Sequence, residues 1–449
     1  MPKTSILRGN VRKQLITLAV PLLLGSLLQQ LYNTADALIV GRYLGAEPFA
    51  AIGVSGTVMN LFIFALNGFC VGSGVLFGQL YGADDKPKFR RASFTALSSG
   101  ACVTLVTSAV SICLMPLILK LLSTPAELRP HCAAYLTVIL SGLICTYLYN
   151  LFSAMLRAIG DTKASLFFLL MSVLLNLILD FLLIAVLRLA IKAAAAATVA
   201  SQTVSVICCV IYIMKKYPSL IFLKEDVGFH RDILSSIMKL GTVSALQQCS
   251  LYLGKLLVQG AVNPLGTAGI AAYTAATRIE GFASSFGDSC GQSMSIFISQ
   301  NYGAGNLPRI REGMRKGMGL LAGMGIALSA IMFAFAGILI PIFLKETSPE
   351  ILKQGCQYLH VVSIFYTLSF LGNGNVGFFR GTGKVLVPFA CTTMHLALRV
   401  ILSYIFVPVY GLGAVALATG IGWVLAVSAQ SSIYFILWKK RAFDRPGAV

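Results

Sequence analysis

The sequence predicts an all-α polytopic membrane protein with about twelve transmembrane helices in two parallel, pseudo-symmetric six-helix bundles. Three observations support this fold class. Of the 449 residues, 57% are hydrophobic and only 11% are charged, whereas soluble domains carry about 25% charged residues. Apolar runs of roughly 20 residues, the length that crosses a bilayer, recur along the whole chain. Motifs of the first half return in the second half in the same order.

Twelve apolar segments meet the length criterion, six in each half. We expect spans over residues 14–38, 49–76, 92–119, 132–156, 164–187, 193–214, 236–261, 268–298, 317–344, 356–379, 385–409 and 412–437. The polar stretch 215–235 joins the sixth span to the seventh, either as an interfacial amphipathic helix or as a plain cytoplasmic linker. We therefore expect an N-terminal lobe over residues 1–220 and a C-terminal lobe over residues 221–449.

An internal repeat relates the two halves. Gln79–Arg91 and Gln300–Glu312 share the pattern Q-x-Y-G-A-x-x-x-P at an offset of 221 residues. Shorter matches follow the same order: Ser26-x-Leu-Gln-Gln30 with Ser244-x-Leu-Gln-Gln248, and Arg157…Gly160 with Arg380…Gly383. An even number of spans per half makes both halves enter the membrane from the same side. This predicts parallel repeats that rock around a central site, as in other transporters built from repeats.

Basic residues gather in alternate loops. The chain has a formal net charge of +19 and 35 Lys and Arg residues. Of these, 25 lie in the termini and in the loops that follow even-numbered spans, seven in the opposite loops, and three within spans, namely Lys255, Arg278 and Arg399. The positive-inside rule then predicts an inner-membrane protein with both termini in the cytoplasm and no removed signal peptide. Loop cations are expected to contact lipid phosphates, and no aromatic-interleaved basic domain suggests nucleic acid.

No enzyme signature is present in the sequence. Eleven cysteines are scattered through apolar runs, and the four histidines lie far apart. The chain has no HExxH, GxSxG, Walker A or strand-linked GxGxxG motif. The sequence therefore predicts a protein that is not an enzyme, with inert buried thiols and no cofactor or metal cluster.

Four acidic residues fall inside predicted spans: Asp36, Asp180, Glu280 and Asp288. A carboxylate in a lipid-facing position costs roughly 2.5–3.5 kcal/mol on insertion scales, so these groups should face protein or a water-filled cavity. The first span also carries Gln29, Gln30, Tyr32 and Asn33. Because Gln29, Asn33 and Asp36 share one helical face, we expect this group of polar side chains to contact substrate.

Asp36 and Asp180 should meet in the outer half of the membrane. They lie in the first and fifth spans, which run in the same direction, and each is past the middle of its span. Asn176 precedes Asp180 by one helical turn, and Thr198 begins the sixth span at similar depth. We expect the two carboxyl groups to titrate as a coupled pair, with Na⁺ as another ligand for Asp36, Asp180 and Asn176.

Glu280 and Asp288 lie in the eighth span. They are eight residues apart, or about 80° around a helix, and could line one wall of a cavity as substrate contacts. Arg278 or Lys255 could instead neutralise Glu280 in a structural pair. The sequence leaves these two interpretations of Glu280 open.

The chain resembles the multidrug and toxic compound extrusion (MATE) family over essentially its full length. The resemblance is carried by the two six-span halves and the Q-x-Y-G-A signature after spans two and eight. Three further segments support it: VPLLLG at 20–25, ADALIVGRYLG at 35–45 and LRAIGDTK at 156–163. It implies an antiporter, acting as a monomer, that exports small amphipathic or cationic compounds in exchange for H⁺ or Na⁺.

The resemblance favours the DinF-like branch of the family. That branch uses acids in the N-terminal lobe, and the matching positions here are Asp36 and Asp180, with Asn176, Thr198 and Asn150 as accompanying polar residues. The NorM-like branch has a cation site in the C-terminal lobe, but its acid positions here are Leu251 and the stretch 369–373, which has no carboxylate. A lipid or lipid-linked saccharide flippase of the same superfamily is the alternative function.

Overall fold

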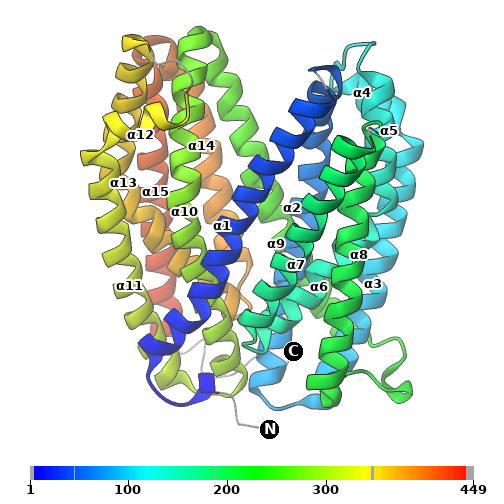
Figure 1. Ribbon diagram of the computed structural model, residues 1–449. Helices are drawn as coiled ribbons and strands as arrows, with labels where there is room; N and C mark the ends of the chain where they lie inside the picture. The colour runs from blue at the N-terminus through cyan, green and yellow to red at the C-terminus, as the bar shows by residue number, and fades with distance from the viewer. Residues whose placement is uncertain (1–4, 45, 188, 345–347, 441–449) are drawn as a thin grey trace. The chain divides into compact units, whose positions relative to one another are not determined.

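The structure, a computed structural model, describes residues 5–44, 46–187, 189–344 and 348–440, and these residues form helices and no strand (Figure 1). Within these ranges, the side chains of Ser5, Asn33, Ala37, Leu38, Val40, Ala46 and Phe49 are outside the description. The chain divides into two compact units. We call Leu24–Ala245 the N-bundle, and Met1–Leu23 with Leu246–Ala448 the C-bundle.

The N-bundle takes its helices from the first half of the chain. They are α1 (Val11–Tyr43, from residue 24), α2 (Ala46–Gly82), α3 (Lys86–Cys113), α4 (Met115–Leu121), α5 (Arg129–Ser141), α6 (Leu143–Ala158), α7 (Thr162–Asp180), the π-helix η2 (Phe181–Val186), α8 (Lys192–Lys216), the 3₁₀ turns η3 (Pro218–Leu220) and η4 (Lys224–Asp226), and the start of α9 (Arg231–Val262).

The C-bundle takes its helices from the second half and from the N-terminus. They are η1 (Ser5–Leu7), the start of α1, the rest of α9, η5 (Asn263–Leu265), α10 (Gly266–Gly303), α11 (Leu307–Ala334), α12 (Ala336–Ile342), α13 (Pro349–Gly381), α14 (Leu386–Tyr410) and α15 (Leu412–Lys439).

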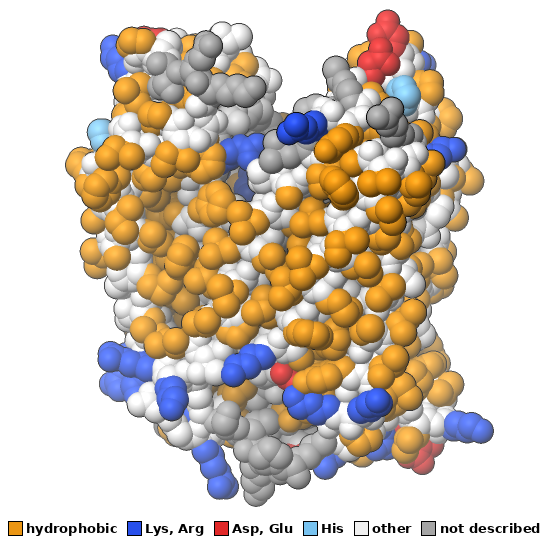
Figure 2. Space-filling view, in the orientation of Figure 1, with side chains coloured by type: hydrophobic (Ala, Val, Ile, Leu, Met, Phe, Trp, Pro, Cys, Tyr) orange, Lys and Arg blue, Asp and Glu red, His pale blue; other side chains and the backbone are white. Residues whose placement is uncertain are grey.

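Helices occupy all twelve of the predicted spans, which confirms the fold class. Eight described helical segments are long and apolar enough to cross a membrane, and the bent pair α5–α6 makes a ninth. The other three, α9, α10 and α13, contain 32, 38 and 33 residues. They are long enough to span but more polar: α9 and α10 carry Lys255, Arg278, Glu280 and Asp288, and α13 carries His360, Asn373 and Asn375. Figure 2 shows hydrophobic side chains over the middle of the helices and Lys and Arg near their ends.

Three of the predicted spans are broken rather than continuous. The span 92–119 is split at Leu114 into α3 and α4, and the span 317–344 is split at Phe335 into α11 and α12. These two breaks are 221 residues apart, the offset of the sequence repeat. The span 132–156 bends by 45° at Gly142, where an added Cβ would lie 2.2 Å from Val199 Cγ2.

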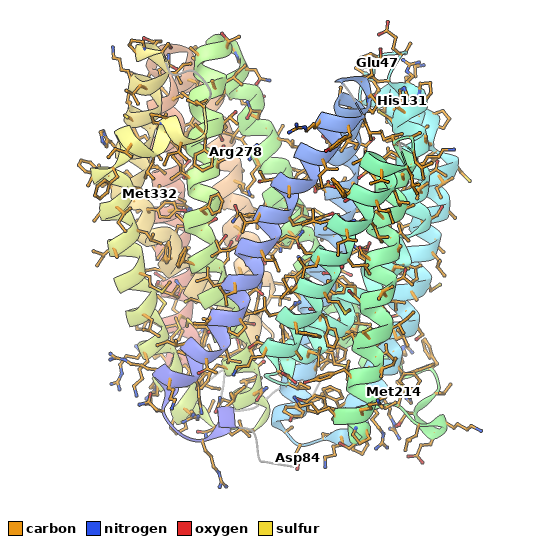
Figure 3. All side chains as sticks on the ribbon, viewed as in Figure 1. Glu47, Asp84, His131, Met214, Arg278 and Met332 are labelled. Carbon is orange, nitrogen blue, oxygen red and sulfur yellow. The ribbon has the colours of Figure 1, made fainter. Side chains whose placement is uncertain are left out.

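The repeated Q-x-Y-G-A motif forms the same turn in each bundle. Asp84 follows α2 with φ 57°, and its counterpart Gly305 follows α10 with φ 69°; Figure 3 labels Asp84 at this turn. The next residue then caps the following helix: Asp85 accepts a hydrogen bond from the backbone N–H of Lys88 at 3.0 Å, and Asn306 accepts the equivalent bond at 3.3 Å. The capping side chains explain why an acid or amide precedes each proline.

Each bundle includes the first part of a long helix that continues into the other unit. In the C-bundle, Ser293 of α10 donates a hydrogen bond to the carbonyl of Leu15 in α1 at 3.1 Å. In the N-bundle, a Cβ on Gly72 of α2 would lie 2.2 Å from the carbonyl oxygen of Leu240 in α9. The backbones therefore pack directly, as small residues allow in membranes. The lobe boundary predicted at residue 220 remains a prediction from sequence; compactness places the boundaries inside α1 and α9.

The connection 215–235 is neither a long amphipathic helix nor a free linker. It forms η3 and η4, and its buried Asp226 accepts a hydrogen bond from Arg90 Nε at 2.6 Å and lies 3.8 Å from Arg91 Nε. The Leu223 N–H donates to Asp226 at 2.9 Å, and Phe222 packs on Phe94 of α3. Burial opposes ionisation of Asp226, but the Leu223 N–H and the two arginines outweigh it and lower the pKa of this carboxyl.

Candidate functional site

α1 and α7 bring Asp36 and Asp180 into direct contact inside the N-bundle. The two carboxyl groups lie within hydrogen-bonding reach of each other, and Asp180 has no solvent-exposed surface. A carboxylate only accepts hydrogen bonds, so two of them can share one only when one carries a proton. The contact therefore needs a proton or another cation between the two groups.

Neutral polar groups surround the pair. In the amide orientation that satisfies both of its polar atoms, Asn176 Nδ2 donates to Asp180 Oδ2 and to the Tyr32 hydroxyl, each at 2.9 Å. Its oxygen accepts from the Thr198 N–H at 3.0 Å. The buried Asp180 Oδ1 has no N–H or O–H donor among the described residues. Asn176 thus fixes one carboxylate oxygen and leaves the other for an ion.

In the described part of the chain, no Lys or Arg side chain interacts electrostatically with the carboxyl group of Asp36 or Asp180. The oxygens of Asp36, Asp180 and Thr198 are the ligand type that a hard cation such as Na⁺ prefers. The described residues contain no group of three or more His, Cys, Asp or Glu side chains that could hold a metal ion. Carboxylate and hydroxyl oxygens of this kind are groups that could accept a proton or an alkali ion.

The π-helix η2 begins at the residue after Asp180. Here Leu187 N bonds to Leu182 O at 2.9 Å, a spacing of five residues. Such wide turns interrupt the regular backbone ladder and often occur at functional sites. The sequence offers no signal for this wide turn, because its residues, FLLIAV, are ordinary apolar helix residues.

The other site residues predicted for the N-terminal lobe differ in how close they lie to the acid pair and in how deeply they are buried. Tyr32 belongs to the centre, Gln30 is half-buried and Gln29 is exposed on the same helix. The side chain of Asn33 lies outside the described residues. Asn150 donates to the carbonyl of Thr146 in its own helix at 2.8 Å, so this amide is engaged within α6.

Tyr135 of α5 is a member of the N-bundle site that sequence reasoning missed. It is buried and lies close enough to interact electrostatically with Asp36 and Asp180. A tyrosine in an apolar span is usually an ordinary core residue, so the position of Tyr135 in the sequence does not indicate a functional role. Only the repeat gives one, because Tyr358 occupies the corresponding place in the second half.

Glu280 in the C-bundle is surrounded by different groups. Tyr358 donates to its Oε2 at 3.0 Å, and Tyr366 donates to its backbone carbonyl at 2.9 Å. Two basic side chains interact electrostatically with Glu280: Arg399 of α14 has the larger effect, and Lys255 of α9 the smaller. The predicted alternative partner Arg278 is not among them, because residues two apart on a helix point to different sides.

Asp288 lies two turns further along α10. Its Oδ1 accepts from Asn373 Nδ2 of α13 at 2.9 Å, and the cations that act on it are Lys255 and Arg380. Its side chain is solvent-exposed although it lies in the middle of a long helix. Glu280 and Asp288 thus share Lys255 as a basic neighbour, whereas Asp36 and Asp180 have none among the residues that the structure describes.

Comparison with known proteins identifies relatives along the whole chain. The family model MatE matches residues 21–182 and 244–405, once in each half. A probable multidrug resistance protein, YpnP of Bacillus subtilis, is 27% identical over 435 residues, 95% of either chain. The probable multidrug resistance protein NorM of Thermotoga maritima is 25% identical over 98% of this chain and 96% of its own. A variant of the Vibrio cholerae MATE transporter VcmN has the same fold, with a TM-score of 0.90 at 20% identity, covering 97% of this chain and 98% of that one.

Proposed function

Because the chain belongs to the multidrug and toxic compound extrusion (MATE) family, whose members are multi-pass membrane transporters and not enzymes, we propose that it is a secondary antiporter. In this proposal it exports small amphipathic or cationic compounds and takes up H⁺ or Na⁺ in exchange. The coupling ion is itself a transported substrate, and no resident cofactor takes part. One chain is the functional unit.

The contact between Asp36 and Asp180 is the observation that carries this proposal. Two carboxyl groups touch inside a membrane-spanning bundle without a basic neighbour among the described residues. Their charge must therefore be balanced by a mobile cation, and intramembrane acids of this kind mark ion pathways. YpnP and NorM are named probable multidrug resistance proteins, which supports a drug-like cargo.

The acid pair couples ion and cargo by changing its charge. When the site opens outward, the pair takes up H⁺ or Na⁺, and the neutralised site loses affinity for a cationic compound, which leaves. When it opens inward, the ion departs and the negative pair recovers its affinity for cargo. The exchange works because each ligand binds one charge state more tightly than the other. Asn176 stays hydrogen-bonded to Asp180 and to Tyr32 in this scheme and keeps Asp180 oriented.

We place the protein in the inner membrane of the cell. Both termini and the connection 217–230 then face the cytoplasm. Asp84 and Met214 lie at one end of the N-bundle and Glu47 and His131 at the other (Figure 3), and the excess of basic loop residues is at the first of these ends. Single cysteines at Lys86 and Arg311, in a background without the native thiols, should resist impermeant maleimides added from outside. Labelling from outside would reverse this topology.

Transport in proteoliposomes tests the function directly. Purified protein is reconstituted, and a pH gradient or a Na⁺ gradient is imposed separately while uptake of the cationic dye tetramethylrosamine is followed by fluorescence. The proposal expects gradient-driven accumulation with at least one of the two ions and none after the gradient collapses. Dye movement that is independent of both gradients would rule out antiport.

A further inference from the structure

A cavity of about 510 Å³ lies at one end of the C-bundle, between the start of α11 and the end of α15. Both helices pack along α13 but make few contacts with each other, so α13 forms the floor between them (Figure 1). We call this cavity the C-groove. The side chains that line it include Arg311, Arg315 and Met318 of α11, Asn375 of α13, and Tyr434 and Phe435 of α15.

Cations outnumber acids in the C-groove. Arg311 and Arg315 are one turn apart on α11 and line the same cavity. Glu312 is the one acid among the described lining residues, and it is ion-paired with Lys316, so these three cations and one acid carry a net charge of +2. In the described part of the chain, no carboxylate oxygen lies within 4.0 Å of either arginine. An anionic ligand would balance this charge.

Aromatic rings hold Arg311 and leave its hydrogen-bond donors usable. The guanidinium carbon lies over the Trp438 ring, 4.5 Å from its centre. Trp438 stacks on Tyr434, which in turn packs against the buried ring of Phe378. A guanidinium that stacks through its face keeps its N–H groups at the edge of its plane. This planar fork matches the oxygens of a phosphate group, which it can bind at two points.

The C-groove combines features of a membrane interface. Tyr, Trp, Lys and Arg side chains at helix ends typically lie at the level of the lipid headgroups, and Tyr434 and Trp438 are near the end of α15, as Arg311 is near the start of α11. Further from these ends, Met318 and Phe435 give the groove an apolar wall. Phe435 is 68% exposed, so this wall faces the lipid side of the helix. The groove therefore suits a molecule with an anionic head and an apolar chain.

The N-bundle fills the corresponding place with its own chain. Arg90, the counterpart of Arg311 in the repeat, donates to Asp226 at 2.6 Å and to Glu225 at 3.2 Å. The turn η3 of the same connection packs against both α3 and α8, and its Leu220 is buried. Acidic groups and an apolar side chain thus occupy this place in the N-bundle. The same combination, supplied by a separate molecule, would match the C-groove.

We propose that the C-groove binds an anionic phospholipid. The phosphate lies between Arg311 and Arg315, and one acyl chain runs along Met318 and Phe435. Basic pockets between membrane helices bind headgroups of this kind. The lipid joins the ends of α11 and α15, as the connection 217–230 joins α3 and α8 in the N-bundle. In the topology proposed above it belongs to the cytoplasmic leaflet, and its binding depends on neither the coupling ion nor the cargo.

Lipid titrations on the purified full-length protein in dodecyl maltoside test the site. The probes are dioleoylphosphatidylglycerol and dioleoylphosphatidylcholine, which have the same acyl chains and differ in headgroup charge, and native mass spectrometry counts the bound lipid. We expect a preference for phosphatidylglycerol that falls about fivefold, or about 1 kcal/mol, in Arg315→Gln and again on adding Arg311→Gln. Lys88→Gln, which removes an exposed charge from the first turn of α3, is the control and should leave the preference unchanged.

Two further measurements identify the ligand. Phe435→Ser should weaken binding of the dioleoyl lipid several-fold and leave binding of dihexanoylphosphatidylglycerol unchanged, because the short chains make little use of the apolar wall. Inorganic phosphate at constant ionic strength should not displace the dioleoyl lipid. Displacement by phosphate would make this a site for the free anion and would overturn the lipid proposal. Arg315 is exposed, so Arg315→Gln remains a valid test if Arg311→Gln does not fold.

The remaining outcomes also decide the proposal. Equal binding of the two dioleoyl lipids to the wild type, or a preference that survives in the double arginine variant, overturns it while the antiporter proposal stands. A variant that ends at Lys440 should bind phosphatidylglycerol as the full chain does. If only the shortened chain binds it, the segment 441–449 is the occupant of the C-groove and the lipid proposal is wrong.

Discussion

The N-bundle and the C-bundle each contain two intramembrane acids, but they surround them with opposite chemistry. Asp36 and Asp180 touch each other among neutral hydroxyl and amide groups. Glu280 and Asp288 are separated along α10 and have three cations around them, Lys255, Arg380 and Arg399. A carboxylate near fixed cations is already neutralised by the protein, whereas a pair without cations needs an ion from solution. The neighbours of an acid, more than its presence in a span, decide whether it can couple transport to an ion.

The largest effect should come from removing the acid pair. Asp36→Asn and Asp180→Asn should each nearly abolish gradient-driven export, and the double variant should be little worse, because in the proposed mechanism the two residues share one ion. The dependence of substrate affinity on pH and Na⁺, typically 5- to 150-fold for a coupled pair of sites, should vanish. Anisotropy titrations of tetramethylrosamine across pH and Na⁺ measure it. Ion-dependent affinity that persists in the double variant would move the coupling site to Glu280 and Asp288.

Glu280→Gln should have a smaller effect on coupling than Asp36→Asn. The amide can still accept the hydrogen bond from Tyr358, but Arg399 loses its carboxylate, so we expect reduced thermal stability with retained ion dependence. Transport at equal expression and thermal unfolding in detergent provide the two measurements. Equal loss of ion-coupled transport in the two variants would remove the distinction between the bundles.

Asn176→Leu should weaken the coupling without abolishing it. The change removes the amide that joins Asp180 to Tyr32 and Thr198, a loss of about 1–3 kcal/mol for a buried group left unpaired. We expect a five- to hundred-fold reduction in ion-dependent affinity, while Asn150→Leu serves as the control, since the Asn150 amide donates to the Thr146 carbonyl of its own helix. If Asn150→Leu reduces ion-dependent affinity more than Asn176→Leu does, the polar residue that supports the acid pair is Asn150 of α6 and not Asn176.

The smallest effects should come from the two corresponding arginines at the repeated turns. Arg90 is paired with buried Asp226, whereas Arg311 lies over the Trp438 ring at 4.5 Å. Arg90→Gln should therefore reduce the free energy of unfolding by about 1.5–3 kcal/mol and Arg311→Gln by about 0.5–1 kcal/mol. Neither should change substrate affinity; a loss of binding in a well-inserted variant would contradict this assignment.

The Arg90–Asp226 contact should also depend on pH. The pKa of Asp226 is below its ordinary value, so its contribution to stability is complete above about pH 3.9, the pKa in the unfolded chain. It is lost as the pH falls through the lower folded-state pKa. The protection of residues 217–230 from hydrogen exchange, relative to the intrinsic rate at each pH, should therefore fall only below about pH 4, and in Asp226→Asn this protection should be low at every pH.

Local sequence patterns predict the features that depend on local chemistry. Hydropathy locates the twelve spans, the repeat anticipates identical turns at Asp84 and Gly305, and residue depth along two helices is enough to bring Asp36 to Asp180. The features that depend on side-chain packing between distant helices could not be predicted. Arg399 of α14 interacts electrostatically with Glu280, far away in the sequence. The break at Leu114 has a local cause in Pro116, the second residue of α4, whereas no proline adjoins the break at Phe335.

The N-terminal segment has a consequence for how the protein is made. Its helix is synthesised before the helices it contacts: Leu15 bonds to Ser293, and the carbonyls of Ile6 and Gly9 bond to Arg309, some 278 to 303 residues later in the chain. At roughly 5–20 residues per second, synthesis of the partner helices takes on the order of 15–60 s. During this interval the hydrogen bonds that join the first segment to Ser293 and Arg309 cannot form. The helix α1 must therefore remain in the membrane without these contacts until its partner helices have been inserted. A chaperone or the insertion machinery can protect it during that time.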